Sequence, residues 1–183
     1  MPGKFIVIDG HDRAMLDRHS AALAGWLRDQ GVRVFTTREP SDGPVGGQVR
    51  QVLNGRLKVA ALPVPLLFLA DRIDHLHREG DGILAHLVTG NWVVCTRYLL
   101  SALAYQGDLL PLDWLARINA PCPWPDIMVW CDSPGGGAVR QRFSEAADYY
   151  GSSGRTVLRL DGDDQSPLRA TCARWLAEAQ EAA

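Results

Sequence analysis

Three arginines stand just beyond three predicted strands, and an arginine side chain is well suited to bind a phosphate. Arg13, Arg38 and Arg97 each come within a few residues of an apolar run of strand type. The guanidinium group offers a planar fork of donors that matches phosphate oxygens. In an open parallel sheet, ligands bind beyond the carboxyl ends of the strands, so we expect these arginines to meet over one crevice.

Side chains that can move protons or hold a metal accompany the first arginine. Asp12 precedes Arg13, and Asp17 lies one helical turn further on. Either carboxylate can orient a water, act as a base, attack phosphorus or hold Mg²⁺. His11 and His19 are further acid–base candidates because histidine titrates near neutral pH. Both aspartates also suit the N-cap of a helix, and this structural interpretation stays open.

The same segment begins like a phosphate-binding loop and then departs from the template. Gly10 follows the first predicted strand, but Met15, Leu16 and Asp17 stand where G-x-x-x-x-G-K-[ST] requires Gly, Lys and Ser or Thr. The cation is missing, and a carboxylate replaces the hydroxyl. Two unit charges about 4 Å apart repel by roughly 4 kcal/mol at an effective dielectric of ~20, so we expect ATP to bind poorly.

Apolar runs alternate with helical patterns along the chain, which is typical of a parallel sheet with crossover helices. No break in composition divides residues 1–183, so we expect a single domain. The predicted strands are Lys4–Asp9, Val32–Thr36, Asn91–Cys95, Asp126–Cys131 and Thr156–Leu160. The predicted helices are Asp17–Gln30, Val45–Leu53, Pro65–Arg78, Leu99–Tyr105, Leu112–Asn119 and Ser166–Ala182.

Composition excludes several classes of function. The chain has 183 residues and a formal net charge of -2, so it lacks the basic field that attracts nucleic acid polymers. No apolar run approaches the ~20 residues that span a membrane, and a strand begins almost at once, which leaves no room for a signal peptide. The four cysteines are scattered, which argues against zinc and disulfides and favours a cytoplasmic location.

Four motifs follow one another along the chain: FIVIDGxDRA from Phe5, TREP from Thr37, LLFLADR from Leu66 and RYxxSxxAYQG from Arg97. In order and spacing, as far as Asp132, they make the chain resemble thymidylate kinase. The resemblance implies a P-loop kinase-like, three-layer α/β/α fold with a five-stranded parallel sheet, and a homodimer.

The resemblance also assigns roles to the matching positions on the phosphate side. Arg38 and Arg97 would hold the 5′-phosphate of a nucleoside monophosphate. Asp12 would lie near the sugar and phosphate, and Arg13 takes the place of a catalytic arginine. His11 lies in the same loop and is included among the substrate-binding candidates.

On the base side, the resemblance implies that Phe68 stacks on the base and that Arg72 reaches a base edge. Tyr105 would press against the sugar, and Gln106 and Ser101 would line the same pocket. From the residues alone, Phe68 fits a buried helix face equally well.

Besides the phosphate-loop segment, two further regions depart from the family. The chain after Arg142 lacks most of the lid that normally closes over ATP. On the acceptor side, Thr96 replaces an aspartate, and Ala102 stands where a polar side chain often contacts the base. A pyrimidine is favoured, but the base and sugar stay open.

The departures gather on the ATP side, whereas the monophosphate side is largely kept. This asymmetry favours a nucleoside monophosphate phosphohydrolase with Asp12, Arg13 and Asp17 as catalytic residues. If Mg²⁺ is used, Asp12 or Asp17 would hold it. The alternatives are a nucleotide-binding pseudokinase without catalysis and an atypical thymidylate or nucleoside monophosphate kinase.

Overall fold

Five parallel strands form the central sheet of the computed structural model, which describes residues 3–181. The strands run in the order β2-β3-β1-β4-β5, with β1 at the centre. Their bounds are β1 (Phe5–Asp9), β2 (Val34–Arg38), β3 (Trp92–Thr96), β4 (Ile127–Asp132) and β5 (Val157–Asp161). All neighbouring pairs are parallel, which confirms the predicted sheet.

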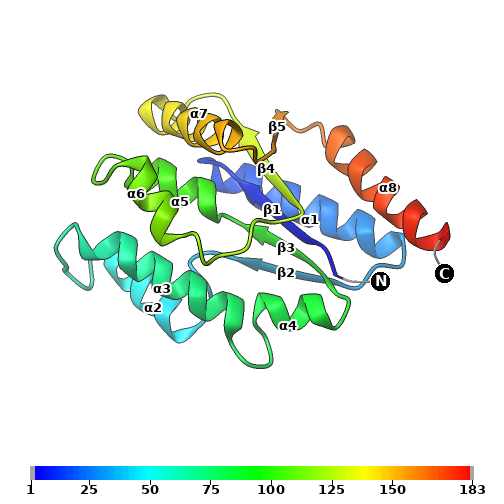
Figure 1. Ribbon diagram of the computed structural model, residues 1–183, viewed down its shortest axis with the longest axis horizontal. Coiled ribbons are helices and arrows are strands. Elements are labelled where there is room, and N and C mark those ends of the chain that lie inside the picture. Colours follow the sequence, from blue (N-terminus) through cyan, green and yellow to red (C-terminus); the bar gives the residue numbers. More distant parts are fainter. Residues whose placement is uncertain (1–2, 182–183) are drawn as a thin grey trace.

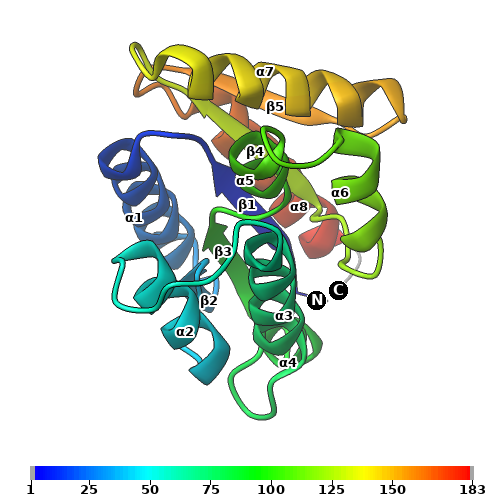
Figure 2. The ribbon, with the colours of Figure 1, turned by 90° about the vertical axis from the view of Figure 1, so that its left-hand side faces the viewer.

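Helices cover both faces of the sheet and make the predicted three layers (Figure 1). Helices α1 (Arg13–Asp29) and α8 (Ser166–Glu181) pack on the face that carries Ile6 and Ile8. The opposite face, with Phe5 and Val7, packs against a larger group of helices in which α7 lies across α5 (Figure 2). This group comprises α3 (Pro63–His77), α4 (Ile83–Val88), α5 (Leu99–Gln106), α6 (Leu112–Ile118) and α7 (Gly137–Ser152), and α2 (Pro44–Leu53) packs on α3.

The predicted strands are all present, and each of their ends lies within two residues of its predicted position. The largest shift is in β2, which ends at Arg38, so this arginine is the last residue of the strand. Two helices were not predicted. Helix α4 has only six residues. Helix α7 begins at Gly137, the last residue of a glycine run that predicted only a flexible turn.

Helix α1 begins four residues earlier than predicted. Asp12 is its N-cap, because the Asp12 Oδ1 atom accepts a hydrogen bond from the Met15 backbone N–H at 3.1 Å. Asp17 therefore lies within the helix, and the interpretation of Asp17 as the N-cap is wrong. Only Gly10, His11 and Asp12 separate β1 from α1.

Within residues 3–181, no helix is long and apolar enough to cross a membrane.

Candidate active site

The sheet register aligns the predicted phosphate-binding residues at one edge. Arg38 of β2 lies opposite Thr96 of β3, and Thr96 lies opposite Ile8 of β1. Arg97 follows directly, and its backbone N–H donates to the Ile8 carbonyl at 3.0 Å. The carboxyl ends of three adjacent strands thus bring Arg38 and Arg97 to the same edge. A crevice shared by all three predicted arginines stays a prediction, because only Arg38 of the three lines the cavity between α1 and β2.

A cavity of about 490 Å³ opens at this edge, between α1 and β2. Arg38, Thr96 and Asp17 line it together, so one of the predicted catalytic carboxylates shares a cavity with one of the predicted phosphate-binding arginines. The Arg38 side chain is about half exposed, and its Nη2 atom lies 3.5 Å from Asp42, which also pairs with Arg50 at 3.6 Å. The remaining lining residues are Ser20, Ala21, Ala24, Arg28, Thr36, Thr37 and Asp42.

Because the β1–α1 loop is short, most of the phosphate-loop segment lies in the first turns of α1. Arg13 and Asp17 are exposed on the first turns of α1, and their side chains pair at 3.6 Å. Met15 and Leu16 point into the core between α1 and the sheet. The lysine position of the template is therefore occupied by a core side chain, while the N-terminus of α1 still presents its positive dipole end to the sheet edge.

Asp9, which was not among the predicted site residues, is the last residue of β1 and binds groups on both sides of this edge. Its carboxylate is fully buried and accepts four hydrogen bonds: from the N–H groups of Gly10, Tyr98 and Ser101, each at 2.9 Å, and from the Ser101 hydroxyl at 2.5 Å. Burial raises the pKa of Asp9, and the hydrogen bonds from Ser101 oppose that shift. Ser101, predicted to contact substrate, thus uses its hydroxyl to bind Asp9.

Arg97 is oriented by its own backbone and by Tyr105. Its φ angle is +66°, the only positive value for a non-glycine residue in the part of the chain that the structure describes. The Arg97 Nη1 atom donates to the Tyr105 hydroxyl at 3.1 Å, and the guanidinium lies 5.4 Å from the centre of the Tyr105 ring. The structure therefore brings these two predicted site residues together.

Arg72 is fully buried and already has several partners. It donates to Glu39 Oε2 from Nε at 2.9 Å and from Nη2 at 2.6 Å, and it also donates to Asn119 Oδ1 and to the Tyr98 carbonyl. The buried charge of Arg72 is thus matched by Glu39, which follows Arg38 directly. Contact with a base edge stays a prediction for this residue.

The other predicted residues are distributed around the same end of the molecule. Phe68 is partly buried on α3, one turn before Arg72. Gln106 is buried at the end of α5, and its Oε1 atom has no hydrogen-bond partner. His11 turns toward the loop after β4, where its Nε2 atom lies 3.1 Å from the Ser133 hydroxyl and its ring covers Gly136.

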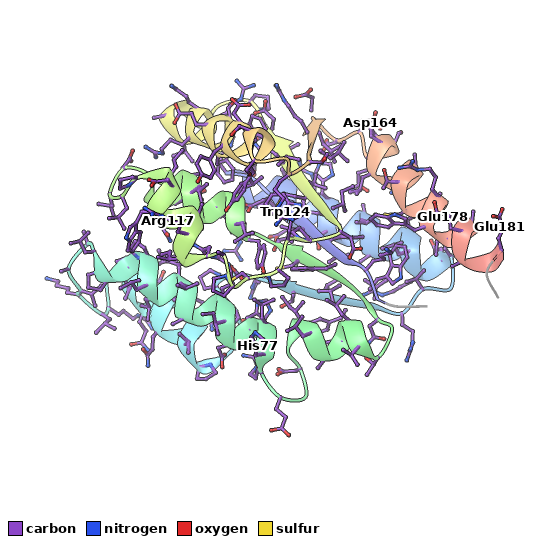
Figure 3. All side chains as sticks on the ribbon, in the orientation of Figure 1. His77, Arg117, Trp124, Asp164, Glu178 and Glu181 are labelled. Carbon is purple, nitrogen blue, oxygen red and sulfur yellow. The ribbon has the colours of Figure 1, made fainter. Side chains whose placement is uncertain are left out.

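A second cavity, of about 430 Å³, lies between α1 and the loop that joins β5 to α8. Arg18 pairs with Asp163 at 3.2 Å at this cavity, and Asp164 lies in the same loop at the start of α8 (Figure 3). Two buried lining atoms have no partner, the acceptor Gln165 Oε1 and the donor Arg169 Nε. Buried His19 also lines this cavity, and its ring binds Gln165 and the Gly162 carbonyl.

The described residues contain no cluster of three or more His, Cys, Asp or Glu side chains that could hold a metal ion. Asp9 and Asp12 both use carboxylate oxygens to bind backbone N–H groups. Asp17 and Asp42 are both exposed carboxylates that line the cavity beside Arg38 and Thr96; Asp42 pairs with two arginines, Arg38 and Arg50, and Asp17 pairs with Arg13. Because Mg²⁺ is commonly held by one or two carboxylates together with substrate phosphates, Asp17 fits such a role.

Comparisons with known proteins agree on one family. The family model described as thymidylate kinase matches residues 8–149. A probable thymidylate kinase of Pyrococcus horikoshii is 37% identical over 73% of this chain and 67% of its own length. The thymidylate kinase of Parasynechococcus marenigrum is 34% identical over 88% of this chain and 83% of its own length.

Solved structures show the same fold. The crystal structure of thymidylate kinase from Ehrlichia chaffeensis superposes with a TM-score of 0.78 at 23% identity and covers 96% of this chain and 99% of that chain. The Candida albicans thymidylate kinase gives a TM-score of 0.70 at 19% identity over 98% of this chain and 93% of that chain.

These comparisons correct the function favoured by the sequence analysis. The phosphohydrolase hypothesis is wrong, because relatives 34–37% identical over most of the chain are named kinases. They point to an ordinary kinase rather than to an enzyme that has lost its ATP site, and they support the kinase alternative. The hypothesis failed because it took the changes at Met15, Leu16 and Asp17 as a change of reaction, although the family match over residues 8–149 includes these three positions.

Proposed function

Since the chain belongs to the thymidylate kinase family, we propose that it transfers the terminal phosphoryl group of ATP to a nucleoside 5′-monophosphate. The relatives' names favour thymidylate as the acceptor. In this reaction an oxygen of the acceptor phosphate attacks the γ-phosphorus of ATP, and the bond from that phosphorus to the β-phosphate oxygen breaks. The products are ADP and a nucleoside diphosphate.

The alignment of arginines at the sheet edge is the observation that carries the proposal. Arg38 and Arg97 would hold the acceptor phosphate, and the position of both at the carboxyl ends of neighbouring strands supports this role. Arg13 lies on the first turn of α1, where its charge adds to the helix dipole. Catalysis of phosphoryl transfer depends mainly on positioning and charge stabilisation, which such a set of cations supplies.

The acceptor's base and sugar would lie toward α3 and α5. Phe68 on α3 would stack on the base, and Tyr105 on α5 would contact the sugar. The unpartnered Gln106 Oε1 atom can accept a hydrogen bond from the base, as from the ring N–H of a pyrimidine such as thymine. Ala102 has no polar side-chain atom, so fewer side chains are left to distinguish one base from another.

The donor would lie along α1. The cavity beside the β5–α8 loop offers Gln165 Oε1 as an acceptor and Arg169 Nε as a donor, which together suit the amino group and ring nitrogen of adenine. Mg²⁺ would be held mainly by the phosphates of ATP, and its charge would offset part of the repulsion between those phosphates and the Asp17 carboxylate. We expect ATP to bind less tightly than a loop with lysine and serine would allow, because Leu16 supplies no charge.

The proposal includes a homodimer. Six of nine large apolar side chains that are exposed in residues 3–181 fall on α2, on α3 or between them. Because these side chains gather on one face, they support a contact between this face and the same face of a second copy of the chain. Light scattering coupled to size-exclusion chromatography tests it. A monomer at all concentrations up to the highest measured would contradict it. The six are Leu53, Leu57, Val59, Leu62, Leu66 and Ile73.

The test of the function is an assay with ATP, Mg²⁺ and each of dTMP, dUMP, dCMP and AMP, followed by ³¹P NMR. We expect equal amounts of ADP and one nucleoside diphosphate. Arg97→Met should abolish most of the transfer, whereas Arg117→Met, an exposed arginine on α6 (Figure 3), should not. A wild-type protein that binds the monophosphate by calorimetry but forms no ADP would contradict the proposal.

A further inference from the structure

Asp9 joins the strand that begins the donor loop to the segment that carries the acceptor arginine. We propose that Asp9 is a positioning residue for the reaction, which fixes the direction of the Arg97 side chain without touching the substrate. The inference rests on the proposed function, because it assumes that Arg97 binds the acceptor phosphate. The carboxylate is fully buried, and its four partners are all donors.

The first step of the argument is the start of α5. The N-cap of this helix is Tyr98, whose side chain makes no capping hydrogen bond. Asp9 of β1 takes the place of this missing cap, because its Oδ2 atom accepts hydrogen bonds from the Tyr98 and Ser101 N–H groups at 2.9 Å each. These groups have no partner within the helix, and a negative charge is favourable at a helix N-terminus. Asp9 therefore fixes where α5 begins relative to β1.

The second step is the backbone of Arg97. A non-glycine residue at a φ angle of +66° is held only where its surroundings impose that conformation. Both sides of Arg97 are bound to β1: its own N–H donates to the Ile8 carbonyl at 3.0 Å, and the next N–H, of Tyr98, donates to Asp9. The resulting turn sends the guanidinium toward the Tyr105 hydroxyl.

The third step is the link to the donor side. Asp9 Oδ1 accepts the Gly10 N–H at 2.9 Å and the Ser101 hydroxyl at 2.5 Å. Gly10 is the first residue of the β1–α1 loop, and Ser101 is in the first turn of α5. One carboxylate therefore sets the spacing between the loop that leads to Arg13 and the turn that carries Arg97.

The test is a double-mutant cycle on monophosphate binding, measured by calorimetry with dTMP alone. Asp9→Asn keeps the size of the side chain but turns one acceptor into a donor that faces N–H or O–H groups. We expect it to raise the Kd about tenfold, since hydrogen bonds to a charged group are being lost. In an Arg97→Met background, the same change should raise the Kd by less than about twofold.

Two further variants keep the test informative. Ser101→Ala removes one hydrogen bond and should give a smaller increase in Kd, which disappears in the same background. Asp126→Asn is the matched control, because Asp126 binds the Phe5 N–H at the opposite end of β1 and should leave the Kd unchanged. Should Asp9→Asn fail to fold, Ser101→Ala carries the cycle.

The outcomes separate the two proposals. Equal losses from Asp9→Asn with and without Arg97 would overturn the positioning role, as would unchanged Kd values in both Asp9→Asn and Ser101→Ala. Absence of ADP formation together with the expected cycle would overturn the kinase function alone. A wild type that binds no monophosphate would overturn both.

Discussion

The Arg97 guanidinium donates to the Tyr105 hydroxyl at 3.1 Å, and the Tyr105 ring meets the edge of Phe143 with ring centres 5.7 Å apart. Arg97 follows β3, Tyr105 belongs to α5 and Phe143 to α7. The arginine that we propose as a phosphate ligand is thus held by Tyr105, and Tyr105 in turn packs against Phe143 of α7. These contacts already restrict the conformations of the Arg97 side chain, so less conformational entropy is lost when it binds an anion.

Tyr105→Phe should weaken monophosphate binding by about threefold, because it removes one partly exposed hydrogen bond and keeps the ring. The KM for the monophosphate should rise while the KM for ATP stays unchanged. Steady-state kinetics with both substrates varied measures this, and Tyr149→Phe on α7 is the control. Equal increases in both KM values would contradict a local effect on Arg97.

Asp42→Asn should strengthen monophosphate binding. Asp42 pairs with Arg38 at 3.5 Å and with Arg50 at 3.6 Å, so it competes with a phosphate for both cations. The pairs are exposed and screened, so we expect a gain of about twofold at low ionic strength that disappears by ~0.5 M salt. Calorimetry at several salt concentrations measures it. Asp81→Asn, which removes a partner of Arg78, should have no effect.

Asp17→Ser should lower the KM for ATP. The change removes an exposed carboxylate from the donor side of the cavity and supplies the hydroxyl of the template. We expect a several-fold decrease in KM, of the order of 1 kcal/mol for a solvent-exposed charge. Leu16→Lys is not an equivalent repair, because Leu16 is buried between α1 and the sheet. A higher KM for ATP in Asp17→Ser would indicate that Asp17 holds Mg²⁺.

The strands could be predicted to within two residues, because β1, β3 and β4 are mostly runs of consecutive apolar residues. This placed Arg38 and Arg97 at one edge of the sheet. The start of α1 could not be predicted, since Asp12 and Asp17 are equally good N-caps. Asp9 was missed because its partners Tyr98 and Ser101 are 89 and 92 positions away in the sequence. A residue whose role depends on contacts between strands carries no local signal.

Glu39→Gln should destabilise the protein by about 3–5 kcal/mol, because it leaves the buried charge of Arg72 without its counter-charge. Urea unfolding at neutral pH measures the free energy of unfolding. Arg72→Met should also be costly, and the double variant should lose less than the sum of the two. Asp113→Asn breaks an exposed pair with Arg117 and should change stability by less than ~0.5 kcal/mol. Additive losses at Glu39 and Arg72 would contradict their coupling.

Asp132 should make the stability of the protein depend on pH below about pH 4. Its carboxylate is buried at the end of β4 and binds Arg140 at 2.5 and 2.9 Å and Arg159 at 2.6 Å. The hydrogen bond from Arg140 holds the pKa of Asp132 below its ordinary value. A carboxyl with a lower pKa in the folded state stabilises that state above the pKa of the unfolded chain, about 3.9, and the contribution is lost as the pH falls through the folded value.

Asp132→Asn should therefore lower the free energy of unfolding by about 1–3 kcal/mol at pH 5–7, a range reduced by the exposure of both arginines. The difference from wild type should shrink between pH 4 and pH 3, because protonation of Asp132 removes the same interaction. Urea unfolding at each pH measures both proteins. Asp148→Asn, at an exposed position on α7, should give a small difference at every pH. A difference that stays constant down to pH 3 would show that the ionised carboxylate of Asp132 does not stabilise the fold.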